Sequence, residues 1–77
     1  GRYLQLRALL DDRPGSLARL VAVVGQAGGN IVEVRHSRMD LALGVFDATV
    51  TLEIEAKGHA HCDTIVAAVK AEGFRTV

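Results

Sequence analysis

The stretch Asp-Asp-Arg-Pro-Gly-Ser-Leu at residues 11–17 gathers residue types that could hold a small polar molecule. It comes just before an apolar helical pattern that starts at Leu17. Free backbone amides and the positive end of a helix dipole would therefore face this loop. Gly15 would let a ligand approach the backbone closely, and the carboxylate of Asp12 could receive an ammonium group. Amides and a carboxylate together suit a zwitterion better than a simple anion.

The same residues also fit a purely structural interpretation, in which they start a helix. Pro14 is tolerated in the first turn because its missing N–H would have no helical partner there. Asp12 is a candidate N-cap. Asn30, which follows two glycines, suits a turn, although its amide could also donate to a ligand oxygen and accept from an amine. Residue types alone leave both interpretations open.

Two further groups of residues could suggest chemistry, and their spacing argues against it. His59, Cys62 and Asp63 would share one side of a helix while His61 points elsewhere, and no second segment completes a set of four ligands. We therefore expect no metal site. The segment His36-Ser37-Arg38 alternates on a strand, so Ser37 would point away from both neighbours. We expect no catalytic residues in this chain.

Hydrophobic periodicity predicts the elements that must position the loop. Period-two alternation indicates strands, and spacing of three and four residues indicates helices. Each expected strand is apolar on one face and each helix along one stripe, so two helices should cover one face of a four-stranded antiparallel sheet, a ferredoxin-like α+β sandwich. The expected segments are a strand at 3–10, a helix at 17–27, strands at 30–38 and 44–55, a helical stripe over 62–69 ended by Gly73, and a short strand at 74–77. Gly28 and Gly29 should end the first helix by allowing a left-handed cap. The apolar stripe of that helix is expected to consist of Leu17, Leu20, Val21, Val24 and Ala27.

Length and composition set the broad class. The 77 residues suffice for a single domain over 1–77, with 49% hydrophobic and 23% charged residues and no net charge. We therefore expect no nucleic-acid partner and no membrane association. A chain this short hides only a modest share of its surface, so a partner chain would add stability. The single cysteine, Cys62, suits a reducing, cytoplasmic compartment, and the start at Gly1 suggests a part of a longer protein.

The loop and the segment after it resemble an ACT domain. The ACT pattern Asp-x-Pro-Gly-x-Leu, followed by a helix and then Asn-Ile or Asn-Val, matches residues 12–17 and 30–31, and the order βαββαβ covers the rest of the chain. The opening Gly-Arg-Tyr-Leu-Gln-Leu-Arg-Ala-Leu-Leu and the segment Asn-Ile-Val-Glu-Val-Arg-His-Ser-Arg at 30–38 further resemble the C-terminal ACT domain of threonine dehydratases, also named threonine ammonia-lyases.

That resemblance implies a site shared between two copies. In the family an amino acid lies between the loop after the first strand of one copy and the start of the second strand of its neighbour. Transferred residue by residue, the effector-binding residues of this chain would be Asp12, Arg13, Pro14, Gly15, Ser16 and Leu17 from one copy and Asn30 and Ile31 from the other.

The implied function is allosteric regulation rather than catalysis. The chain would be a homodimer or a higher homo-oligomer that binds isoleucine, valine, threonine or serine and controls an attached catalytic domain. This chain itself would hold no cofactor, because the pyridoxal phosphate of a threonine dehydratase would sit on the catalytic domain.

Two other functions share this predicted fold. Acylphosphatases use an arginine in the first loop and an asparagine on the second strand, which Arg13 and Asn30 superficially match, but Pro14 follows Arg13 directly and the loop lacks a glycine-spaced cradle of amides. RNA-binding RRM domains stack bases on aromatic residues of the open sheet face, whereas this chain has only three aromatic residues and an acidic strand face. Both remain alternatives to the regulatory domain.

Overall fold

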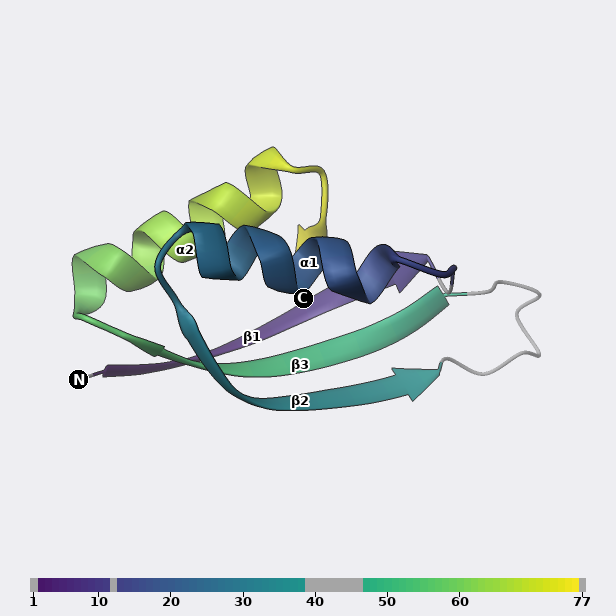
Figure 1. The fold of residues 1–77 in the computed structure, drawn as a ribbon, viewed down its shortest axis with the longest axis horizontal. Helices are drawn as coiled ribbons and strands as arrows, with labels where there is room; N and C mark the ends of the chain where they lie inside the picture. Colours follow the sequence, from purple (N-terminus) through teal and green to yellow (C-terminus); the bar gives the residue numbers. More distant parts are fainter. Residues whose placement is uncertain (1, 12, 39–46, 77) are drawn as a thin grey trace.

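A computed structural model of the chain describes residues 2–11, 13–38 and 47–76 (Figure 1). Its elements follow the predicted order βαββαβ. In chain order they are β1 (Arg2–Asp11), α1 (Ser16–Gln26), β2 (Asn30–Arg38), β3 (Asp47–Ala56), α2 (His59–Ala71) and β4 (Arg75–Thr76).

The strands form one four-stranded sheet in the order β2-β3-β1-β4. Every neighbouring pair is antiparallel. Both helices lie on the same face of this sheet, and nothing within residues 2–11, 13–38 and 47–76 forms a layer over the other face (Figure 1). The predicted ferredoxin-like α+β sandwich is confirmed.

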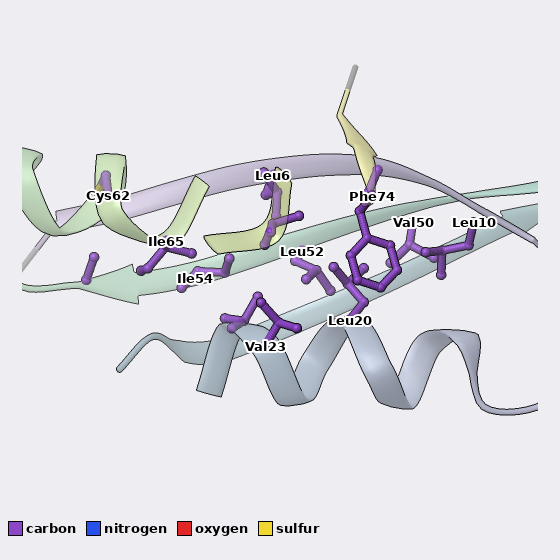
Figure 2. Packing of buried hydrophobic residues seen from close by; sticks show 14 residues of the cluster. Leu6, Leu10, Leu20, Val23, Val50, Leu52, Ile54, Cys62, Ile65 and Phe74 are labelled. Atoms are coloured by element: carbon purple, nitrogen blue, oxygen red, sulfur yellow. The ribbon is translucent and has the colours of Figure 1, made fainter. Parts of the chain in front are cut away.

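Alternating side chains of β1 and β3 form the floor of the core. Leu6 pairs directly with Leu52 and Ala8 with Val50, so that apolar residues of both strands share the helix-covered face. These residues are at most 4% exposed, because the helices close over them (Figure 2). The predicted one-sided character of both strands is therefore confirmed.

The helix α1 packs on the sheet through Leu20, Val23 and Val24, which are buried. The predicted stripe included Val21 instead of Val23, and the structure leaves Val21 only half-buried. The spacing i, i+3, i+4 fits both sets, and the rotation of α1 against the sheet selects the second one.

Two glycines end α1, each for a different reason. Gly28 has a φ of 86° and lies in the left-handed region, as predicted. The amide of Gly28 donates to Gly25 O and the amide of Gly29 to Val24 O, both at 3.0 Å, which is the bond pattern of a Schellman motif. At Gly29 there is no room for a side chain, because a Cβ there would lie 2.8 Å from Ile54 Cγ2.

The second helix and the strand ends largely follow the predicted pattern. The helix α2 buries Cys62, Ile65 and Val69 and is followed by Gly73 at a φ of 94°. The strand β2 has the predicted bounds, β1 is longer at both ends, and β4 is shorter than predicted. The predicted start of the third strand at Gly44 lies outside the described residues.

Candidate functional site

The loop between β1 and α1 forms a tight, exposed turn. The amide of Arg13 donates to Asp11 O at 2.8 Å, and the amide of Ser16 donates to Arg13 O at 3.2 Å. Gly15 has a φ of 89°, a left-handed conformation that an L side chain would strain. The glycine of the Asp-x-Pro-Gly-x-Leu pattern is thus required by the backbone of this turn.

The structure corrects two predicted details of the helix start. Gly15 occupies the N-cap position, not Asp12, so Pro14 lies in the turn before the helix rather than in its first turn. With the left-handed turn at Gly15, the helix begins at Ser16, two residues after the proline. Asp12 itself lies outside the described residues, so its expected contact with an ammonium group stays a prediction.

The first turn of α1 offers backbone donors to the solvent. Within the described part of the chain, no side-chain hydrogen bond caps this helix, and its first turn carries no acidic residue. Gly15 O accepts from the amide of Arg19 at 2.9 Å, which starts the helical ladder one turn later. The amide of Ser16 already donates to Arg13 O, so the amides of Leu17 and Ala18 are the ones that have no partner one turn back in the helix. A carboxylate at the helix start would be attracted by these donors and by the helix dipole.

The other half of the predicted site lies far from this loop within one chain. Asn30 and Ile31 begin β2, which follows the C-terminal end of α1, whereas the loop precedes its N-terminal end (Figure 1). An 11-residue helix is about 16 Å long, so the two groups lie at opposite ends of this helix. The structure brings residues 13–17 together and keeps Asn30 and Ile31 apart from them.

Asn30 and Ile31 also differ in their surroundings. The exposed amide of Asn30 makes a long contact of 3.5 Å from Nδ2 to Glu55 Oε1. Ile31 is half-buried and packs against the core. Asn30 is therefore available to a neighbouring molecule, whereas Ile31 offers only part of its side chain.

A cavity of about 150 Å³ adjoins the loop on the side of β4. Asp11, Ser16, Arg19 and Phe74 line it in part. The guanidinium of Arg19 stacks over the Phe74 ring at 4.8 Å from the centroid, which holds the cation near this cavity. Sequence reasoning missed Arg19, because its aromatic partner comes from the other end of the chain and no local pattern connects them.

The strand β2 lies at the edge of the sheet, with β3 as its one neighbour among the described strands. Two of its apolar residues are unusually exposed, Val32 at 49% and Val34 at 41%. A long edge strand with exposed β-branched residues is a template for pairing with another strand. This edge runs between the two separated halves of the predicted site.

The register of β2 shows how His36 and Ser37 are placed. His36 pairs with Val50 and Ser37 with Thr49, so they lie on opposite faces of β2. Nowhere in residues 2–11, 13–38 and 47–76 do three potential metal ligands gather. No helix in this part of the chain has the length and apolar character needed to cross a membrane.

Comparisons with known proteins agree with the predicted resemblance. The chain is 35% identical over 74 residues to an L-threonine ammonia-lyase of Geobacter sulfurreducens and 30% identical over 74 residues to one of Thermotoga maritima. Each alignment covers 96% of this chain but 18% of the relative, so the chain spans about a fifth of the length of these relatives. No protein-family model matches the chain.

A solved structure shares the fold. It is a prephenate dehydratase from Arthrobacter aurescens in complex with L-Phe, with a TM-score of 0.62 and 15% identity, and the match covers 95% of this chain and 25% of that one. The ferredoxin-like architecture expected of an ACT domain is thus found in a known structure. The predicted resemblance to the ACT domain of threonine ammonia-lyases is confirmed over nearly the whole chain.

Proposed function

Because nearly the whole chain is similar to a segment of L-threonine ammonia-lyases, we propose that it is a regulatory domain that binds a small amino acid between two copies. It would control an attached catalytic domain with threonine ammonia-lyase activity. The pyridoxal phosphate of such an enzyme belongs to the catalytic part, and no residue of this chain is assigned to it.

The observation that carries this proposal is the position of the two half-sites at opposite ends of α1 (Figure 1). One chain cannot close a small ligand between them. If β2 pairs antiparallel with β2 of a second copy, the start of the partner's β2 comes to the end of the sheet where the loop lies. The two half-sites then meet twice, once at each end of the pair.

Charge selects the register of this strand pair. Glu33 and Arg35 lie on the same face of β2, with Arg35 Nε 3.6 Å from Glu33 Oε2. Pairing centred on Val34 puts Glu33 opposite Arg35 of the second copy. A shift of the pairing centre by one residue puts Glu33 on Glu33 or Arg35 on Arg35, which is unfavourable.

The residues at the junction match the groups of an aliphatic amino acid. The open amides at the start of α1 and the Ser16 hydroxyl would receive the carboxylate. The Asn30 carbonyl of the second copy and the carboxylate of Asp12 would accept from the ammonium group. Leu17 and Ile31, both half-buried, would contact the aliphatic part, which favours isoleucine or valine, with threonine and serine as smaller candidates.

Regulation follows if the two arrangements of the paired domains differ in affinity for the amino acid. The ligand contacts both copies, so it stabilises the arrangement in which the half-sites meet. It can shift the enzyme only as far as its affinities for the two arrangements differ. The L-Phe complex of the structural neighbour supports an amino acid as the class of ligand for this fold.

Titration calorimetry of the chain with isoleucine, valine, threonine, serine and phenylalanine tests the proposal, with molar mass measured on the same samples. We expect saturable binding of at least one of the four small amino acids at one molecule per chain. Ser16→Ala and Asn30→Ala should each weaken it about tenfold, whereas the exposed control His59→Ala should not. An intact dimer that shows no binding heat with any of them would refute the proposal.

A further inference from the structure

The sheet face that the helices leave open carries a separated pattern of charge. Because paired residues of antiparallel strands share a face, the register identifies its members row by row. One row holds Gln5, Glu53 and Glu33, and the next holds Arg7, Thr51 and Arg35. Glu55 lies beyond the first row, and Arg75, paired with Leu9, lies beyond the second.

This face therefore has an acidic half and a basic half along the strands. The acidic half contains Glu33, Glu53 and Glu55, and the basic half contains Arg7, Arg35 and Arg75. The arginines and Glu33 are exposed, and the other two glutamates are half-buried. Asp11 ends β1 on the same face, beyond Arg7 and Leu9. Three arginines against this one carboxylate leave that half basic among the described side chains, so the face is dipolar along the strands.

We infer that this open face is an interface for a second copy of the chain, stacked face to face. A two-fold axis across the strands, at the level of Leu6, Leu52 and Val34, places the acidic half of each copy over the basic half of the other. An axis along the strands would place glutamates over glutamates and arginines over arginines. The charges thus select one orientation.

The apolar residues of the face agree with the same axis. Tyr3, which is 67% exposed, lies at the acidic end, and the half-buried Leu9 lies at the basic end. The axis brings Tyr3 of one copy over Leu9 of the other. A shallow hollow of about 500 Å³, lined in part by Tyr3, Gln5 and Glu53, leaves room for the incoming side chain.

The stacking does not depend on the proposed function, but it is compatible with the edge pairing described there. The edge axis passes through Val34 normal to the sheet, and the stacking axis crosses β2 at the same level. Two perpendicular axes that meet at one point close into a tetramer. Edge pairing alone gives a dimer, stacking alone gives a different dimer, and both together give four copies.

Sedimentation equilibrium of the chain at low and high salt tests the inference. Opposed charges weaken with ionic strength, so the molar mass should double at about 20 mM salt relative to about 500 mM salt, whether the smaller species is a monomer or a dimer. Arg7→Glu should weaken the salt-dependent association about tenfold or more, because it puts an acidic residue over the acidic half of the other copy. Lys70→Glu on α2 changes the net charge equally and should have no effect.

A charge exchange separates the interface from a general effect on charge or folding. Arg7 and Glu53 exchange halves in the double variant Arg7→Glu/Glu53→Arg, which restores opposed charges between copies. We expect the double variant to associate better than either single variant, with unchanged circular dichroism in all three. A mass that is independent of salt, or equal loss in the double variant, would overturn the inference even if the amino-acid titration succeeded.

Discussion

The imidazole of His61 joins the start of α2 to the end of α1 through the carbonyl of Ala27. His61 Nε2 lies 2.7 Å from Ala27 O, and His61 Nδ1 accepts from the amide of Lys57 at 2.9 Å. Since Nδ1 accepts, the ring proton must sit on Nε2 and be donated to Ala27. Ala27 and His61 are 34 residues apart in the sequence. Gly28 follows Ala27 directly, and a Cβ added at Gly28 would lie 3.1 Å from His61 Nε2.

His61→Ala should destabilise the chain by about 0.5–1.5 kcal/mol, because it removes the part-buried hydrogen bond to the Ala27 carbonyl together with the exposed one from the Lys57 amide. Urea unfolding followed by circular dichroism measures the change. His59→Ala removes an exposed histidine two residues away and should change the free energy of unfolding by no more than about 0.5 kcal/mol. Equal effects of the two substitutions would show that the His61 hydrogen bonds add nothing.

Gly29→Ala should be among the most damaging small substitutions in the chain. Its Cβ would lie 2.8 Å from Ile54 Cγ2, 2.9 Å from Val24 Cγ1 and 3.1 Å from Ile65 Cδ1. Overpacking of this kind costs about 1–3 kcal/mol.

The matched control for that substitution is Gly25→Ala. A Cβ at Gly25 meets nothing within 4 Å, and alanine is the better helix former by up to about 1 kcal/mol. Thermal unfolding should therefore move in opposite directions for the two variants. A destabilised Gly25→Ala variant, or a neutral Gly29→Ala variant, would contradict the packing described here.

Arg19→Ala should cost about 0.5–1 kcal/mol through loss of the stacking on Phe74. Arg13→Ala, at an exposed loop position, removes the same charge without such a contact. The difference between the two variants in urea unfolding isolates the contact. If Arg19→Met, which keeps the apolar stem, were as stable as the parent chain, packing rather than the cation would explain the effect.

The fold could be predicted because its main signals are local. Alternation in β1 and β3 and the glycines after α1 and α2 each depend on near neighbours in sequence. The bulge at Val32, where the register with β3 shifts between Ile31 and Glu33, has no such signal. The space restriction at Gly29 arises from Ile54 and Ile65, which only the folded chain brings near.

The candidate site could be predicted only in part. The turn at Gly15 follows from residue types in one short segment, and the structure supports it. The N-cap was predicted wrongly, because both an aspartate before a proline and a left-handed glycine can start a helix, and their competition depends on the path of the loop. The distance between Asn30 and the loop is set by the length of α1, because the two lie at opposite ends of that helix.

Val34→Lys links the assembly to ligand binding, and it tests the strand register as well. In the proposed β2 pair, Val34 lies opposite Val34 of the second copy, so lysine would place two like charges at the centre. Val34 is 41% exposed in a single chain, so the fold itself should be retained.

The Val34→Lys variant should lose edge pairing. Because each ligand needs both copies, its affinity for the amino acid should fall by the same free energy that pairing contributed. Ala67→Lys adds the same charge at an exposed position of α2, away from both proposed interfaces, and should leave the affinity intact. Calorimetry and molar mass on one set of samples decide the matter: a monomeric Val34→Lys variant that still binds the amino acid tightly would place the whole site within one chain.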